Sequence, residues 1–177
     1  MDYEGLLTLS IKSSLEKIIQ HCFYCNRIVD RMVSWISVKF VMPNTANIIH
    51  PNIAHMYLGS LGADGISEYM DARNCTTIYG GTPIGDQEYE SPRECFNKLL
   101  EINLEWENLV KDSIKLAKEE NDYTTMVFLE SYLKNIINIT KDILTLSDKI
   151  DFYDDTKAGW MRFDKDIKDF PIFEENN

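Results

Sequence analysis

The sequence predicts an all-α protein, folded as a four-helix bundle with one long crossover. Apolar side chains recur at steps of three and four residues along four long segments, which is the period of an amphipathic helix. The connection between the second and third segments, residues 74–90, is long and rich in glycine and proline, whereas the other connections are short. Two helical hairpins joined by one long crossover form a known bundle topology.

The first two predicted helices span about residues 10–38 and 51–73. The first carries one apolar stripe, made of Ile11, Leu15, Ile18, Cys22, Cys25, Val29, Met32 and Ile36. The second is expected to begin at Pro51, because a first helical turn does not need the N–H that proline lacks. It carries three glycines along one side, although each costs a helix about 0.5–1 kcal/mol relative to alanine. These are Gly59, Gly62 and Gly65.

The third and fourth helices are predicted at about residues 92–119 and 123–150. Ser91 and Glu94 match a capping box at the start of the third helix, with proline between them at the first helical position. Its inward stripe is Phe96, Leu99, Leu100, Asn103, Trp106, Val110, Ile114 and Ala117. The stripe of the fourth is Met126, Leu129, Leu133, Ile136, Ile139, Ile143 and Ile150. A short fifth helix is expected at about 160–170, and the whole chain, 1–177, as a single domain.

Composition and charge exclude several classes of function. The chain of 177 residues has a net charge of -11, so a surface that binds nucleic acid is not expected. It contains no run of about 18 apolar residues, so no membrane span is expected. Phosphate-binding, nucleophile-elbow and HExxH motifs are also missing.

The cysteines and the N-terminal sequence predict a cytoplasmic protein. The first residues lack the basic-then-apolar form of a secretory signal, so four cysteines are expected to be reduced thiols. Cys22 and Cys25 have the spacing of a redox or zinc pair. They lie inside a helical pattern with no second such pair, which favours two core cysteines.

Several short segments resemble bacterial non-haem ferritins, in order and with matching spacing. They are MVSW (32–35), EYESPRECF (88–96), NDYTTMVFLESYL (121–133) and GWMRFDKDI (159–167). The resemblance implies a ferritin-like bundle with a short C-terminal helix. In that family, carboxylates and a histidine from the four helices hold two iron ions inside the bundle.

Carried over position by position, the resemblance leaves no iron ligand in place. The equivalent positions are Cys22, Gly59, Gly62, Asn103, Ile136 and Ile139, and we expect none of them to bind metal. Ile136 and Ile139 would then fill the space left by the two glycines, which keeps the bundle centre packed. An alternative is that the glycines open a slot for an apolar ligand or a haem. Gly65 has no specific explanation.

Asn103 needs a hydrogen-bond partner if it lies in the core. An unpaired buried amide costs about 1–3 kcal/mol. We therefore expect Cys22, a water molecule or a backbone carbonyl beside it.

A second alignment provides other candidate metal ligands. Sliding the second helix by seven residues puts His55 on the histidine position, and sliding the third by four puts Glu107 on its glutamate position. Asp64 and Glu68 share one helix face, which resembles the inter-subunit iron site of mini-ferritins. These four residues would be the ligands of a rearranged site.

The resemblance implies an iron-storage shell subunit that has lost its oxidation centre and is not itself an enzyme. Iron would be stored without an intact di-iron site. The subunit would self-assemble, into 24-subunit shells if it follows the family, or co-assemble with active ferritin subunits. Two alternatives remain open: an active iron(II) oxidase, ferritin or mini-ferritin, with a rearranged site, and a structural or interaction protein that no longer uses iron.

Overall fold

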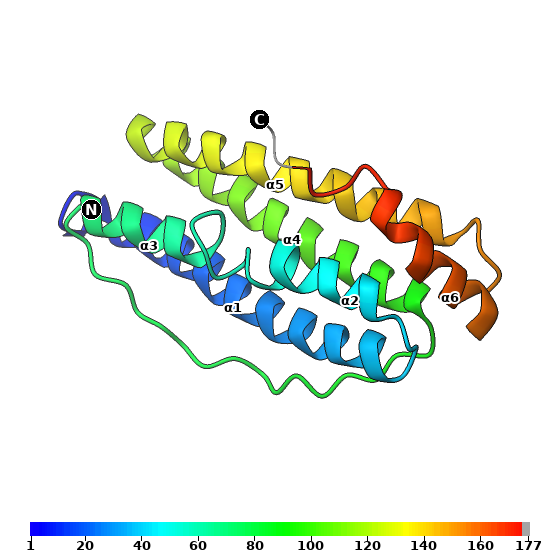
Figure 1. The fold of residues 1–177 in the computed structure, drawn as a ribbon. Coiled ribbons are helices and arrows are strands. Elements are labelled where there is room, and N and C mark those ends of the chain that lie inside the picture. The colour runs from blue at the N-terminus through cyan, green and yellow to red at the C-terminus, as the bar shows by residue number, and fades with distance from the viewer. Residues whose placement is uncertain (175–177) are drawn as a thin grey trace.

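Four rods of helix, joined in antiparallel hairpins, form the body of the protein in a computed structural model that describes residues 1–174 (Figure 1). Three rods are single helices: α1 (Leu9–Val38), α4 (Pro92–Glu119) and α5 (Tyr123–Ile150). The second rod consists of α2 (Pro43–Ile49), the π-helix η1 (His50–Ala54) and α3 (Ala63–Ala72). The short helix α6 (Lys157–Asp166) follows, with one 3-10 turn, η2 (Ile167–Asp169). The predicted all-α bundle with a long crossover is confirmed.

Local sequence accounts for the ends of the long helices. Thr8, Ser91 and Asp122 are the N-caps of α1, α4 and α5, and each side chain accepts a hydrogen bond from a backbone N–H three residues later. These bonds satisfy donors that a helix leaves free in its first turn. The predicted inward stripe of α1 is fully buried. The periodicity of the apolar residues and the N-caps therefore account for three of the four rods.

The second rod differs from the prediction. It begins at Pro43 instead of Pro51, and it is not one helix over residues 51–73. Pro51 lies inside η1, where the backbone widens. In a regular α-helix the proline ring would clash with the carbonyl four residues earlier, and a wider turn relieves that clash. After η1 the chain unwinds through residues 55–62, then resumes as α3.

Two of the three glycines, Gly62 at the end of the unwound segment and Gly65 in the first turn of α3, lie close to the backbone of that segment. A Cβ atom on Gly62 would lie 2.1 Å from the backbone oxygen of Tyr57, and one on Gly65 would lie 2.1 Å from that of Ser60. The prediction that Ile136 and Ile139 fill the space left by Gly59 and Gly62 is wrong, because the atoms nearest to a Cβ on either glycine belong to the backbone of residues 55–57. Backbone approaches at Gly62 and Gly65, and not helix packing, explain why only glycine fits at these two positions.

The crossover runs along α1 and is attached to it by side chains (Figure 1). The N–H of Ile78 donates to Glu16 Oε1 at 2.9 Å. Farther along, Arg31 Nε donates to the oxygen of Gln87 and Trp35 Nε1 donates to that of Tyr89, both at 2.9 Å. A segment without regular structure thus obtains partners for part of its backbone.

Two features at the ends of the chain were not predicted in detail. A small antiparallel hairpin, β1 (Tyr3–Glu4) with β2 (Leu7–Thr8), precedes α1. The last helix begins at Lys157, with Thr156 as its N-cap, and not at residue 160.

The buried Asp164 on α6 accepts hydrogen bonds from the backbone N–H groups of Asn44 and Thr45. It thereby caps α2 from a distance.

Within residues 1–174, no helix combines the length and the apolar character that crossing a lipid bilayer requires.

Replacing Gly62 by alanine is expected to lower the free energy of unfolding by about 1–3 kcal/mol, because the new methyl group meets the Tyr57 backbone oxygen. A continuous helix would give the opposite sign, since alanine is the better helix former. Chemical unfolding followed by circular dichroism measures the change.

The control is Gly59→Ala, whose Cβ would meet no atom nearer than 3.6 Å. It should be neutral or stabilising by up to about 1 kcal/mol. A Gly62→Ala protein as stable as the parent would contradict the role assigned to the unwound segment.

Candidate functional site

Six buried side chains from three of the rods and the unwound segment fill the centre of the bundle. We call them the central cluster: Cys22, Tyr57, Asn103, Trp106, Tyr132 and Thr140. Tyr57 comes from the unwound segment, whereas the other five project from α1, α4 and α5. Every rod therefore contributes at least one polar or sulfur-bearing side chain to the cluster. Two of its members, Cys22 and Asn103, are positions that the resemblance equates with iron ligands.

A chain of hydrogen bonds crosses the central cluster. Tyr57 Oη donates to Asn103 Oδ1 at 3.0 Å, and Asn103 Nδ2 donates to Thr140 Oγ1 at 2.7 Å. Thr140 Oγ1 lies 2.9 Å from the backbone oxygen of Ile136, to which it donates. The expected partners of Asn103 were wrong: a phenol and a hydroxyl satisfy this amide, and Cys22 does not bond to it.

Unwinding of the second rod places Tyr57 in the centre, and side chains on neighbouring rods bind backbone oxygens at the two ends of the unwound segment. Tyr132 Oη donates to the oxygen of Gly62 at 3.0 Å. Asn26 Nδ2 on α1 donates to the oxygen of Ala54 at 2.9 Å. The ring centroid of Trp106 lies 5.2 Å from that of Tyr57 and 5.8 Å from that of Tyr132, both edge-on. The break and the aromatic filling are therefore one structural feature.

Burial keeps the ionisable groups of this region neutral. It raises the pKa of the Cys22 thiol to about 12. It also raises the pKa values of Cys25, Tyr57 and Tyr132. A thiol must lose its proton to bind a metal ion. The centre is consequently an uncharged environment at neutral pH.

The Cys22–Cys25 pair consists of two core thiols. Both are free and buried, which confirms the core interpretation. Cys25 Sγ lies 3.2 Å from His21 Nε2, which donates to the oxygen of Ile102 at 2.8 Å. Burial lowers the pKa of His21, so this imidazole is neutral as well.

The positions that the resemblance equates with iron ligands are only partly brought together. Cys22, Asn103, Ile136 and Ile139 are buried side chains of the bundle interior, whereas Gly59 and Gly62 lie in the unwound segment. A di-iron site in such a bundle needs several carboxylates and imidazoles. A thiol, an amide and two aliphatic side chains do not provide that donor set.

One carboxylate, Glu107, borders the central cluster. Its Oε2 lies 3.4 Å from Thr140 Oγ1, and its Oε1 forms an ion pair with Lys111 Nζ at 2.6 Å. The other candidates for a rearranged site are exposed: His55, in the unwound segment, and Asp64 and Glu68, on α3. Nowhere in residues 1–174 do three or more His, Cys, Asp or Glu side chains stand together as a group that could hold a metal ion.

Tyr57, Tyr132 and Thr140 were missed by the sequence analysis. Tyr57 fits an apolar helical stripe as well as an unwound segment, so its role depends on recognising the break. The three glycines that follow it were the available signal, once they are interpreted as a break in the helix instead of one of its faces. Tyr132 and Thr140 lie beside predicted stripe positions and carry no further sequence signal.

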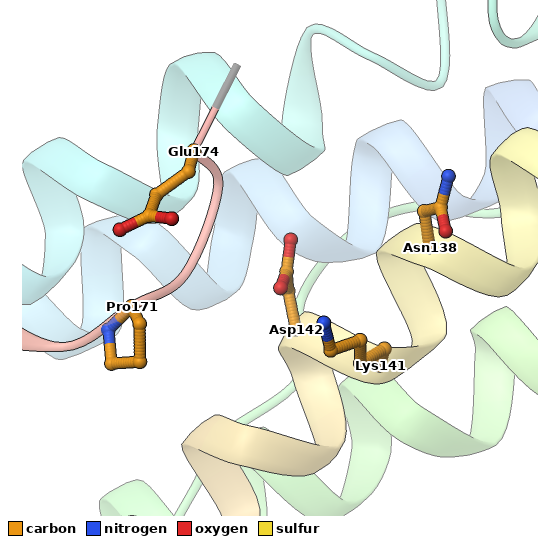
Figure 2. Close-up of a pocket in the computed structure, with 5 residues that line it drawn as sticks. All are labelled: Asn138, Lys141, Asp142, Pro171 and Glu174. Carbon is orange, nitrogen blue, oxygen red and sulfur yellow. The ribbon is translucent and has the colours of Figure 1, made fainter. Parts of the chain in front are cut away.

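A small pocket of about 100 Å³ lies away from the centre, between α5 and the C-terminal segment (Figure 2). Its lining includes Asn138, Lys141, Asp142, Pro171 and Glu174. Asp142 already accepts a hydrogen bond from the N–H of Phe173, at 3.1 Å, and burial raises its pKa. We assign this pocket a structural role in holding the C-terminal segment.

Comparisons with known proteins give a family, from a family model, and a fold, from solved structures. The family model for a ferritin-like domain matches residues 61–152. Solved structures that are similar include a PmFTN variant soaked in iron for 45 min, with a TM-score of 0.79 and 15% identity, covering 89% of this chain and 98% of that one. Another PmFTN variant, soaked in iron for 5 min, has a TM-score of 0.80 and 14% identity, with coverages of 89% and 98%. No curated protein matches the sequence.

Tyr57→Phe is expected to lower the free energy of unfolding by about 1–3 kcal/mol, because it leaves the buried Oδ1 of Asn103 without its donor. Tyr123→Phe is the matched control. Its side chain is 59% exposed, so the change should stay within about 0.5 kcal/mol. Thermal or chemical unfolding of both variants measures the difference.

A double-mutant cycle on Tyr57→Phe and Asn103→Leu tests the bond between these residues directly. Removing both partners should cost less than the sum of the single changes, with a coupling of at least about 0.5 kcal/mol. Strictly additive costs would show that the phenol and the amide do not depend on each other.

Proposed function

Because the chain belongs to the ferritin-like domain family, we propose that it is an iron-storage shell subunit without a working di-iron oxidation centre. The observation that carries this proposal is the central cluster. It is a neutral set of aromatic, amide and hydroxyl groups, in which Tyr57, Asn103 and Thr140 form a chain of hydrogen bonds. It includes Cys22 and Asn103, which the family resemblance equates with iron ligands. Because these groups are uncharged, they do not need a metal ion to balance a buried charge.

The energetics of burial support a lost centre. A carboxylate left at the Asn103 position without metal would be a buried charge without a partner, which costs several kcal/mol. An amide of similar shape avoids that cost once Tyr57 and Thr140 bond to it. Replacement of ligands by neutral groups is thus the stable outcome once iron is no longer bound at this place.

The remaining parts of the proposal concern assembly and iron. The similar solved structures are PmFTN variants soaked in iron, and the chain covers nearly their full length. We extend this to a subunit that self-assembles, into a 24-subunit shell if it follows the family, or that co-assembles with active subunits. The net charge of -11 would attract iron cations to the assembly. We also propose a cytoplasmic location, because the cysteines are expected to be reduced thiols.

Oxygen uptake after addition of iron(II) tests the lost centre. The purified protein should consume oxygen no faster than buffer containing the same iron. A rate of oxygen consumption above that of the buffer would contradict the proposal. Its loss in Glu107→Gln would then assign the activity to the rearranged site, since Glu107 is the one candidate of that site that borders the central cluster.

Native mass tests the shell. Gel filtration with light scattering should give an assembly of several hundred kilodaltons, against 20.6 kDa for one chain. Elution as a monomer, with no iron retained after loading, would favour the alternative of a structural or interaction protein.

A further inference from the structure

A surface pocket of about 280 Å³ at the C-terminal end of α1 gathers positive charge, although the chain as a whole carries a net charge of -11. Its lining includes Arg31, Trp35 and Lys39. These residues are four positions apart along the end of α1, whose C-cap is Lys39, so they share one side of the helix. The guanidinium carbon of Arg31 lies 4.8 Å from the centroid of the Trp35 ring, and Lys39 Nζ lies 5.5 Å from it. One aromatic ring thus holds two cations at the same pocket.

Contacts with the crossover fix the aromatic ring and the guanidinium. Trp35 Nε1 donates to the oxygen of Tyr89 at 2.9 Å, and the two rings meet edge-on with their centroids 6.3 Å apart. Arg31 Nε donates to the oxygen of Gln87, also at 2.9 Å. This bond uses one of the five N–H donors of the guanidinium and restricts its orientation. Within residues 1–174, the η nitrogens of Arg31 have no hydrogen-bond acceptor, so they remain available to a ligand.

Neither cation of the pocket is neutralised by the described part of the chain. Arg31 and Lys39 take part in no ion pair within residues 1–174. Glu88 on the crossover also lines the pocket, but its carboxylate pairs with neither of them. The exposed Ser34 and Val38 complete the lining with a hydroxyl and an apolar surface. The pocket therefore keeps an excess of positive charge.

We propose that this pocket binds a phosphate group. A guanidinium offers parallel donors that match two phosphate oxygens, and an ammonium adds a compact positive charge. The Ser34 hydroxyl is a further donor at the same pocket. The volume is just below the range of about 300–1,000 Å³ that is usual for sites of drug-sized ligands, which favours inorganic phosphate or a small phosphomonoester. This site is separate from the central cluster and does not depend on the proposed function.

Phosphorus NMR of sodium phosphate tests the site in the metal-free protein, whatever its state of assembly. At constant ionic strength, the protein should broaden the phosphate signal, and the bound fraction should saturate as phosphate is added. Arg31→Gln should weaken binding at least about tenfold, because it removes charge-assisted donors, and Lys39→Gln should weaken it as well. Arg162→Gln, which removes an exposed arginine paired with Asp154, is the control and should bind like the parent. Absence of saturable binding, or equal affinity in the parent and in both pocket variants, would overturn the proposal.

Glu88→Gln separates a ligand site from a merely structural role of the two cations. It should tighten phosphate binding, since a carboxylate in the pocket repels a phosphate anion. A loss of fold or of crossover packing would not produce a gain in affinity. Unchanged or weaker binding in Glu88→Gln would contradict the assignment of phosphate to this pocket.

Competition distinguishes the two sources of the phosphate group. Adenosine monophosphate that displaces inorganic phosphate at a lower concentration than phosphate itself does would identify a phosphomonoester as the ligand. Displacement only at a higher concentration would identify the free ion. Equal displacement by adenosine, which carries no phosphate, would show that the pocket does not recognise the phosphate group.

Discussion

The break in the second rod depends on one constraint: every backbone group that leaves the helical ladder inside the protein needs another partner. Backbone bonds within the segment meet much of that need: the N–H of Ala63 donates to the oxygen of Tyr57 at 2.9 Å, and that of Asp64 donates to the oxygen of Leu58 at 3.3 Å. Two side chains on other rods add to these bonds. Asn26 binds the oxygen of Ala54, and Tyr132 binds the oxygen of Gly62, one on each side of the unwound residues. Without Asn26 the oxygen of Ala54 would lack this partner in the core, and an unpaired carbonyl costs about 1–3 kcal/mol. The oxygen of Gly62 also belongs to α3, of which Gly62 is the N-cap, so Tyr132 adds a second bond there. The break is therefore supported by its neighbours and is not a local defect.

The same break determines what both sides of the rod present. Toward the interior, it allows Tyr57 to reach Asn103 between the other rods. Toward solvent, the π turn that precedes it sets His50 beside His55. A continuous helix would rotate these residues onto other faces, because its turn holds 3.6 residues throughout. The neutral centre and the surface histidine pair thus have one backbone origin.

Sequence reasoning succeeded where side-chain periodicity and local caps determine the structure. It located α1, α4 and α5, and it placed Cys22 and Asn103 in the interior. It failed at the second rod because glycines three residues apart fit a helix face as well as a tight backbone approach. The structure distinguishes these two explanations, because a Cβ atom added to Gly62 would lie 2.1 Å from the backbone oxygen of Tyr57. The partners of Asn103 were also beyond its reach, since they come from elements far apart in the chain.

Asn103 and Glu107 show how far the neutral region extends along α4. They are one helical turn apart, about 6 Å along the axis, and both approach Thr140. Asn103 is fully buried and uncharged, whereas the side chain of Glu107 is 14% exposed and paired with Lys111. A carboxylate is tolerated at the second position because water and a lysine reach it, and neither reaches the first. Access to solvent, more than helix position, thus decides which polar group α4 can carry beside the bundle centre.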